Sequence, residues 1–317
     1  MNRRGQAVGK YYALLSLTAA IWGVQPLFIK LAVREITPVS PTVARFVLIS
    51  ATIFLIMRWR RKTPLLPPPA CLLPLFCMGV SGVAINNVAQ FSGLQYSTVG
   101  NATLIASTTP AVTALLAALF LRERLLPVQW MGIVISLAGV LLLSSKGSLD
   151  ALLHISFNYG DMLFFCAQLG WAAYTLIGFR VMRHLSALGV TAWAGVFGAL
   201  ITFVYGLFTG ELHYAPLSAT GMACMAYVVW AGGVCAMAFW NLGIKAVGAG
   251  QAAVFLNIMP LMGVGAGIVV LGENFYWQEC FGAAGILFGV YLLTQVRRML
   301  RRRNLRRGRR HGAARRA

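Results

Sequence analysis

Charged residues, and acidic residues in particular, are scarce in this sequence. Only 11% of the 317 residues are charged and only seven are Asp or Glu, whereas charged side chains make up roughly 25% of a soluble globular domain. Apolar residues account for 59% of the chain. So few charged side chains cannot cover the surface of a water-soluble globular protein, and the composition therefore excludes this class of protein. The composition instead predicts a protein that crosses the lipid bilayer many times.

Motifs for ATP use, metal binding and covalent catalysis are also missing. The chain has no G-x-x-x-x-G-K-[ST] phosphate loop, which argues against an ATP-driven pump. Its six cysteines form no C-x-x-C pair, so we interpret them as small buried apolar residues rather than disulfides or metal ligands. All four histidines fall in predicted loops or the tail: His154, His184, His213 and His311. An intramembrane enzyme therefore has little chemistry available, and no metal or other cofactor is predicted.

Long apolar runs recur along the whole chain. Runs of about 18 to 25 residues can cross the hydrocarbon core of a bilayer as helices. The sequence predicts ten such spans: 11–33, 39–57, 70–94, 98–121, 127–145, 159–179, 187–209, 219–243, 249–272 and 276–296. The first run continues past the roughly 7–15 residues of a cleavable signal sequence, so we expect it to be retained. The expected fold class is an all-α integral membrane protein with ten transmembrane helices.

The two halves of the chain repeat one another. Residues recur 150 positions later in these pairs: Pro110 and Pro260, Glu123 and Glu273, Gly132 and Gly282, Gly139 and Gly289. Each half holds five predicted spans, and an odd number of spans inserts the second copy upside down relative to the first. The expected organisation is two inverted five-helix repeats, 1–147 and 148–296, followed by an arginine-rich tail, 297–317. Inverted repeats of this kind are typical of secondary transporters.

Basic residues are distributed unevenly between the two sides of the predicted membrane. With the N-terminus inside, 23 of the 27 Lys and Arg residues fall in cytoplasmic segments, eleven of them in the tail, and three fall outside. The positive-inside rule then places both termini in the cytoplasm. This distribution explains the net charge of +20 without a nucleic-acid partner. The expected location is the bacterial inner membrane, with the tail on anionic lipid or disordered.

Motifs in five of the spans form a family pattern. They are Trp22-Gly23, Arg45, Pro110 followed by Leu121-Arg122-Glu123-Arg124, Gly160-Asp161, and Leu271-Gly272-Glu273. With these motifs in order, the chain across residues 11–296 resembles the EamA-type transporters of the drug/metabolite transporter superfamily. The resemblance implies a cavity lined by the first, third, fourth, sixth, eighth and ninth helices, and export of small metabolites such as amino acids. It does not imply a particular metabolite.

Polar and aromatic side chains inside the spans are the candidate substrate-binding residues, because polar groups in lipid are costly unless they face the bundle interior or a wet cavity. The candidates are Trp22, Gln25, Asn86, Asn87, Gln90, Asn101, Thr108, Gln168, Trp171, Tyr174, Trp240, Asn241, Gln251 and Asn257. Asn86, Asn87 and Gln90 are predicted to share one helix face, and Asn101 and Thr108 another. This lining suits a neutral or zwitterionic amphipathic solute. The same residues also fit a structural interpretation, in which amides bond neighbouring helices and aromatics fill gaps.

Two prolines and three charged residues have less specific interpretations. Pro110 and Pro260 fall near the middle of their predicted spans, where each removes a helix hydrogen bond, and they are candidate hinges or static kinks. Asp161 begins a span and is expected to cap it. Arg45 and Lys30 lie near the outer ends of their spans, where we expect them to snorkel outward and anchor the topology. Contact with a substrate carboxylate at the outer mouth is the alternative.

Together these features favour a secondary transporter that moves a small-molecule substrate by alternating access, as a monomer or a homodimer. A channel is less favoured because no ring of acidic residues or repeated filter is present. A structural membrane subunit is the third interpretation, and it predicts that substitution of the amide residues leaves function intact. Asp161, Glu123 and Glu273 are expected at helix ends near water, which predicts transport without tight coupling to protons through a buried carboxylate.

Overall fold

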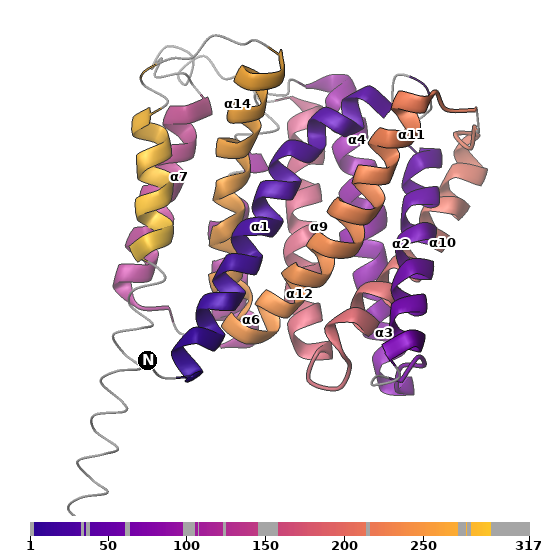
Figure 1. Cartoon of the computed structure of the whole chain (residues 1–317), viewed down its shortest axis with the longest axis horizontal. Coiled ribbons are helices and arrows are strands. Elements are labelled where there is room, and N and C mark those ends of the chain that lie inside the picture. Colours follow the sequence, from indigo (N-terminus) through magenta and orange to yellow (C-terminus); the bar gives the residue numbers. More distant parts are fainter. Residues whose placement is uncertain are drawn as a thin grey trace, which may run out of the picture.

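The structure is a computed structural model, and it is helical wherever it has regular elements. The residues that it describes are 3–32, 35, 39–60, 64–97, 105–106, 108–122, 125–144, 158–213, 216–271, 277 and 280–292. This part of the chain contains no strand (Figure 1). Seven helices in it are long and apolar enough to cross a membrane: Gly9–Ile29, Val39–Arg60, Pro69–Gln90, Tyr159–Val181, Ala187–Thr209, Ala219–Val247 and Ala249–Ala266. Three shorter apolar helices are Thr109–Leu121, Pro127–Leu142 and Cys280–Leu292.

The elements follow most of the predicted spans closely, but the third, eighth and ninth are interrupted by other helical geometry, and the described part of the fourth is interrupted by a turn at Thr108. The first half forms α1 (Arg3–Ala32), α2 (Val39–Arg60), α3 (Pro69–Met78), η1 (Gly79–Ile85), α4 (Asn86–Tyr96), α6 (Thr109–Leu121) and α7 (Pro127–Ser144). The second half forms α9 (Tyr159–Val181), α10 (Ala187–Thr209), α11 (Ala219–Ala226), η2 (Tyr227–Cys235), α12 (Ala236–Val247), α13 (Ala249–Ala253), η3 (Val254–Asn257) and α14 (Ile258–Leu271). The predicted third, eighth and ninth spans are each a series of three elements, because a stretch of different helical geometry interrupts each α-helix.

Short polar side chains determine where several helices begin. At the start of α9 the Asn158 side chain accepts from the Asp161 N–H at 3.1 Å, and the Asp161 carboxylate accepts from the Asn158 N–H at 2.8 Å. Ser186 and Ser218 cap α10 and α11 through their hydroxyls, each accepting from a backbone N–H at 3.0 Å. Asp161 therefore has the expected capping geometry. It is buried, however, which corrects the expectation that it lies near water.

One pair of corresponding helices in the two halves runs in opposite directions. α10 is the counterpart of α2, and the two pack side by side. Just past the end of α10, the backbone N–H of His213 donates to Oγ of Ser40, the second residue of α2, at 2.8 Å. Near the start of α10, the Ala192 carbonyl accepts from Ser50 Oγ at 3.0 Å. This antiparallel arrangement of counterparts is what an inverted repeat requires.

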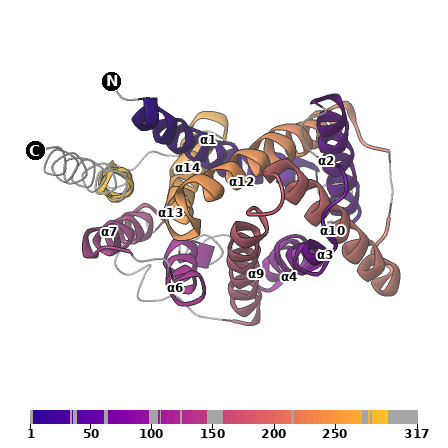
Figure 2. The ribbon, with the colours of Figure 1, turned by 90° about the horizontal axis from the view of Figure 1, so that it is seen from below.

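Helices from the two halves interleave instead of forming two separate bundles. Figure 2 shows α9 and α12 between a group that contains α2, α3, α4 and α10 and a group that contains α6, α7, α13 and α14. Glycines allow some of the closest approaches. A Cβ on Gly160 of α9 would lie 2.5 Å from the carbonyl oxygen of Gly93 on α4, so only a residue without a side chain fits there.

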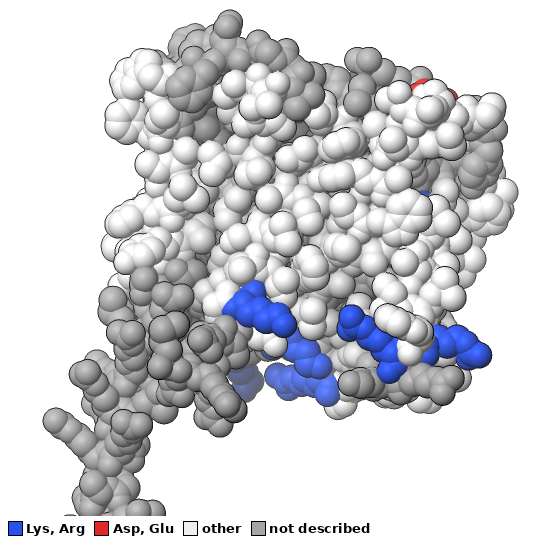
Figure 3. All heavy atoms as spheres, viewed as in Figure 1, with Lys and Arg blue, Asp and Glu red and all other residues white. Residues whose placement is uncertain are grey.

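The surface has an apolar middle and charged ends. Figure 3 shows the described Lys and Arg atoms gathered mainly at one end, which we call the basic end, and a few Asp or Glu atoms at the other. Large apolar side chains in the middle of their helices, such as Leu115, Val134 and Leu200, are exposed between these ends, as contact with lipid requires. All six cysteines are free, but four are exposed, which corrects the expectation that they are buried: Cys77, Cys166, Cys235 and Cys280.

Glu35 ties the connection between α1 and α2 to the start of α11, at the end of the molecule opposite the basic end. Its carboxylate accepts from the Ser218 hydroxyl at 2.7 Å and from the Ser218 N–H at 2.8 Å. These bonds hold the pKa of Glu35 below its ordinary value, with the hydroxyl contributing most and the N–H next. The contact joins the two halves of the chain.

Replacing Glu35 by glutamine is expected to lower the melting temperature of the detergent-purified protein at neutral pH, because glutamine keeps the shape of the side chain but not its charge. A carboxyl group whose pKa is lower in the folded protein than in the unfolded protein stabilises the fold at pH values above its unfolded-state pKa, near 4.5. This stabilisation is lost as the pH falls through the folded-state pKa. The difference between the wild type and Glu35→Gln should therefore be present at pH 7 and vanish toward about pH 3. Thermal melts across this range test it, and a difference independent of pH would contradict it.

Candidate functional site

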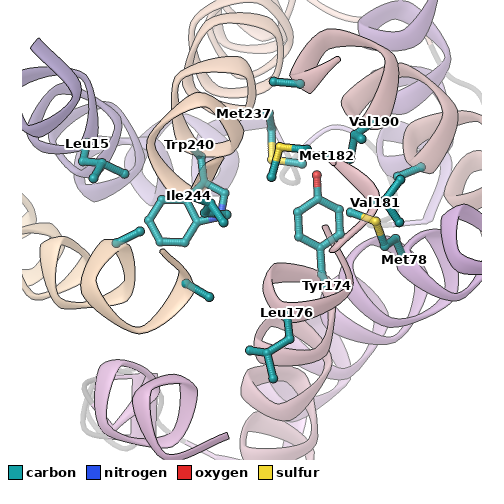
Figure 4. Close-up of a cluster of buried hydrophobic side chains, with 14 of the residues drawn as sticks. Leu15, Met78, Tyr174, Leu176, Val181, Met182, Val190, Met237, Trp240 and Ile244 are labelled. Atoms are coloured by element: carbon teal, nitrogen blue, oxygen red, sulfur yellow. The ribbon is translucent and has the colours of Figure 1, made fainter. Parts of the chain in front are cut away.

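Four aromatic side chains from three helices meet between the two repeats. Trp22 belongs to α1, Trp171 and Tyr174 to α9, and Trp240 to α12. Between ring centroids, Trp22 lies 5.2 Å from Trp171 and 5.7 Å from Trp240, and Trp171 lies 5.2 Å from Tyr174. Tyr174 and Trp240 are fully buried on facing elements (Figure 4), whereas Trp22 and Trp171 keep part of their surface exposed. All four residues are candidates predicted from the sequence, and the structure brings them together as one aromatic cluster.

Polar atoms without partners border this aromatic cluster. Trp22 donates its indole N–H to the carbonyl oxygen of Gly232 at 2.8 Å. Among the described residues, neither the buried indole N–H of Trp240 nor the buried Oε1 of Gln25 has a hydrogen-bond partner. Gln25 Oε1 lies against Gly232, where an added Cβ would be 1.9 Å from it. Because buried polar groups are rarely left unpaired, these two atoms mark a place where a ligand or water can bind.

The packing around the aromatic cluster repeats the internal symmetry of the chain. Gly82 and Gly232 are counterparts in the two repeats. A Cβ added to Gly82 would lie 2.4 Å from Cδ2 of Tyr174. In the same way, a Cβ added to Gly232 would contact the side chain of Gln25. Tyr174 and Gln25 are themselves counterparts in the sequence. Each repeat therefore contributes a glycine that receives a side chain from the helix pairing with it.

These glycines lie in two π-helical segments at corresponding positions. η1 interrupts the third predicted span at Gly79–Ile85, and η2 interrupts the eighth at Tyr227–Cys235. π-helical turns interrupt the regular α-helical hydrogen-bond pattern and occur frequently at functional sites. Neither segment was predicted from the sequence. The available signal was the presence of glycines in the middle of apolar runs.

Asn241 forms a fully buried network that joins three helices. Its Nδ2 donates to the Tyr174 hydroxyl at 3.0 Å and to Thr191 Oγ1 at 2.8 Å, which links α12 to α9 and α10. Thr191 Oγ1 in turn donates to the Ala187 carbonyl at 2.9 Å. Oδ1 of Asn241 is buried without a partner in the described part of the chain. The two donated bonds have the geometry of interhelical bonding, and Thr191 was not among the sequence candidates.

Three further candidate amides also bond to neighbouring helices. Asn86 donates to the Ala167 carbonyl at 2.9 Å, which connects α4 to α9. Gln168 Oε1 accepts from the Thr109 hydroxyl at 2.6 Å, which connects α9 to α6. The third, Asn257, donates to Ser136 Oγ on α7 at 2.7 Å. All three amides are buried.

Asn87 and Arg45 form a polar pair that was not predicted from the sequence. Arg45 Nη2 donates to Asn87 Oδ1 at 2.8 Å, and Asn87 Nδ2 donates to the Val83 carbonyl at 2.6 Å. Arg45 thus reaches inward from α2 to α4, and the expectation that it snorkels outward is wrong.

Asn86 and Asn87 bond to different helices, and Gln90 is exposed. The three residues therefore do not form one shared lining face, because neighbouring positions on a helix point about 100° apart.

The other candidates are less well defined. Thr108 donates to the Ile105 carbonyl at 2.7 Å, just before α6 begins. Gln251 is partly exposed on α13. Asn101 lies outside the described residues. The side chain of Lys30 is also outside the described part.

Both candidate hinge prolines follow an interruption of α-helical structure. Pro110 is the second residue of α6, after a turn at Thr108. Pro260 is the third residue of α14, directly after the 3₁₀ turn η3. Proline is tolerated in the first helical turn, where its missing N–H has no intrahelical acceptor. The expectation that each proline interrupts an otherwise continuous α-helix is therefore corrected: each lies in the first turn of an α-helix that follows an irregular segment.

Comparison with known proteins identifies the family to which this arrangement belongs. The model of the EamA-like transporter family matches the chain twice, over residues 9–145 and 158–295. The chain belongs to the EamA-like transporter family. Two matches in series show that the EamA domain is present twice, which confirms the internal duplication seen in the sequence and in the packing.

Relatives of this EamA-family chain are similar to it over most of their length. YyaM of Bacillus subtilis (strain 168), an uncharacterized transporter, is 28% identical over 85% of this chain and 88% of its own. An S-adenosylmethionine/S-adenosylhomocysteine transporter of Chlamydia trachomatis serovar L2 is 25% identical over 93% of this chain and 90% of its own. One solved crystal structure, 20% identical, has a TM-score of 0.76 and covers 90% of this chain and 97% of that one, which shows a shared fold. The EamA-family chain is a multi-pass membrane transporter.

Proposed function

We propose that this chain is a secondary transporter that exports small amphipathic metabolites, such as amino acids and their derivatives, by alternating access. The observation that carries the proposal is the edge-to-face contact of Trp22 and Trp171, which are counterparts in the two repeats and lie 5.2 Å apart. In transporters built from inverted repeats, the substrate site lies at the repeat interface near the bilayer midplane. Trp22 is about 15 Å from the end of α1 at 1.5 Å per residue, which is half the thickness of a hydrocarbon core of roughly 30 Å.

The chemistry of this interface suits a solute with an apolar part and a polar part. The exposed faces of Trp22 and Trp171 can stack on an apolar or aromatic group. The unpaired Gln25 Oε1 can accept from an ammonium or amide N–H, and the Trp240 N–H can donate. S-adenosylmethionine, named for the Chlamydia relative, combines an aromatic base with an amino-acid group, which fits this type of lining.

The proposed topology follows from the charged ends of the molecule. We place the basic end in the cytoplasm by the positive-inside rule, with both termini on that side of a bacterial inner membrane. The three shorter apolar helices complete ten spans in this proposal. Reporter fusions at the two termini test it, because termini on opposite sides of the membrane would exclude an even number of spans.

The interrupted helices provide a way for the repeats to move. The π-helical segments η1 and η2 and the breaks before Pro110 and Pro260 occur at corresponding places in the two repeats. Helices bend most readily where the regular hydrogen-bond pattern is already broken. We propose that these four places are the hinges of the transport cycle. The static alternative, in which they only shape the packing, predicts unchanged turnover when the prolines are replaced.

Purified protein in liposomes is expected to show counterflow of its substrate without an imposed pH gradient. The substrate is first identified by comparing metabolites in cells and medium between overexpressing and deleted strains, which also gives the direction of transport. Asp161 caps α9 and binds Ser97, so we expect its role to be structural rather than proton transfer. Uptake that requires a pH gradient and is lost in Asp161→Asn, Glu123→Gln or Glu273→Gln, with folding intact, would show proton coupling instead.

A further inference from the structure

Arg45 is a cation inside the bundle, and its guanidinium is only partly satisfied. It is the seventh residue of α2, about 9 Å along the helix from its start, and its side chain is only partly exposed. One nitrogen, Nη2, donates to Asn87 Oδ1 at 2.8 Å, and the guanidinium carbon lies 4.7 Å from the centre of the Phe46 ring. The buried Nε–H has no acceptor among the described residues. A charged donor left in this state calls for an anion.

The chain does not supply that anion from its described carboxylates. Glu35 binds Ser218, and Asp161 binds Ser97 and caps α9. Glu211, the third described carboxylate, is exposed just past the end of α10. Within the described residues, no ion pair joins Arg45 to an acidic side chain. A guanidinium keeps its charge in a protein, and a charge within an apolar span is costly unless an opposite charge compensates it. The described structure therefore leaves one positive charge uncompensated inside the span.

We propose that Arg45 binds the carboxylate of the transported solute, which makes the substrates monocarboxylates such as amino acids. This inference rests on the proposed transport function and deepens it. One guanidinium matches the single charge of a carboxylate, whereas a phosphate monoester carries nearly two charges. Figure 3 shows that the other described basic atoms gather mainly at the basic end, about 20 Å from Arg45 along α2 at 1.5 Å per residue.

Asn87 acts in this proposal as a positioning residue. Its Nδ2 bond to the Val83 carbonyl, at 2.6 Å, fixes the orientation of the amide and turns Oδ1 toward Arg45. Oδ1 then holds Nη2, which limits the rotation of the guanidinium and presents its other nitrogens. An amide can do this without neutralising the cation. A carboxylate at the same position would neutralise it.

The test measures ligand-induced thermal stabilisation of the full chain in a maltoside detergent, which contains no phosphate. The probes are L-phenylalanine, L-phenylalaninamide and phenethylamine, so that the ring and the amine stay the same while the carboxylate is removed. For the wild type we expect half-maximal stabilisation by phenylalanine at a concentration at least about tenfold lower than by the other two, which corresponds to about 1.4 kcal/mol. Arg45→Gln should abolish this preference and Arg45→Lys should retain part of it. Arg58→Gln, at the exposed end of the same helix, is the matched control.

Asn87→Asp provides a second variant in case Arg45→Gln does not fold. It keeps the size of the side chain and gives Arg45 an internal carboxylate, so we expect normal folding and loss of the preference for phenylalanine. A preference that survives in Arg45→Gln or Asn87→Asp, or the absence of any preference in the wild type, would overturn the proposal. So would stabilisation by added anionic lipid, in place of the amino acid, that depends on Arg45.

Counterflow measured in parallel separates this inference from the transport function. A wild type that prefers the carboxylate in binding but shows no counterflow would refute the transport proposal and leave the Arg45 inference standing. Equal counterflow of phenylalanine and phenylalaninamide would refute the role of Arg45 and leave transport intact.

Discussion

Replacing Trp22 by alanine is expected to reduce substrate counterflow in proteoliposomes by about tenfold or more. The substitution removes two ring contacts, with Trp171 and Trp240, each worth about 0.5–1.5 kcal/mol beyond burial. It also removes the hydrogen bond to the Gly232 carbonyl. Since a factor of ten corresponds to about 1.4 kcal/mol, loss of one stacking contact to the substrate at the upper end of this range is enough to produce a tenfold effect. Trp171→Ala should act similarly, because it removes the counterpart ring from the other repeat.

Two matched variants show which property of Trp22 matters. Trp22→Phe keeps an aromatic face but loses the indole N–H, so we expect a smaller reduction than for alanine. Trp230→Ala removes an exposed tryptophan of the neighbouring segment η2 and should leave counterflow nearly unchanged. Protein yield and elution from size exclusion are measured for each variant. If Trp22→Ala folds normally and transports like Trp230→Ala, the aromatic cluster is not part of the substrate site.

The helical spans and the gathering of aromatic residues could be predicted because both depend on local sequence. An apolar run long enough for the bilayer specifies a helix almost irrespective of its neighbours, so the predicted 187–209 and α10 coincide. Trp22 and Trp171 occupy corresponding positions in the two repeats, which predicts equivalent depths in the membrane. Equivalent depths on helices that meet at the repeat interface bring such rings together, as the 5.2 Å separation shows.

The rotation of each helix about its axis could not be predicted. Depth along a span does not say which neighbour a side chain faces, so the sequence placed Asn86 and Asn87 on one shared face. The structure has Asn86 bonded to α9 and Asn87 bonded to Arg45 on α2. Hidden interruptions add to this difficulty. The π-helical turns of η1 shift all later side chains of the span relative to an ideal α-helix, and periodicity alone does not reveal them.

Gly82→Ala is expected to destabilise the protein by about 1–3 kcal/mol, which is the usual cost of forcing an extra methyl group into a packed core. The new Cβ would lie 2.4, 2.5 and 2.6 Å from Cδ2, Cγ and Cβ of Tyr174. Tyr174 has no room to retreat, because it is fully buried and its hydroxyl is held by Asn241 at 3.0 Å. We therefore expect a lower melting temperature and a lower folded yield. Gly265→Ala is the control, since nothing lies within 4 Å of its added Cβ.

The counterpart substitution Gly232→Ala should affect transport more than stability. Its Cβ would lie 1.9 Å from Oε1 of Gln25 but 3.0 Å from Cδ and 3.8 Å from Cγ, so rotation of the flexible end of that side chain can relieve the contact. The rotation displaces an amide oxygen that the proposed site uses. The expected result is a melting temperature near that of Gly265→Ala together with counterflow reduced by severalfold. Because the two glycines are sequence counterparts, equal loss of stability in both variants would show that the site is symmetric packing and that Gln25 has no separate role in binding.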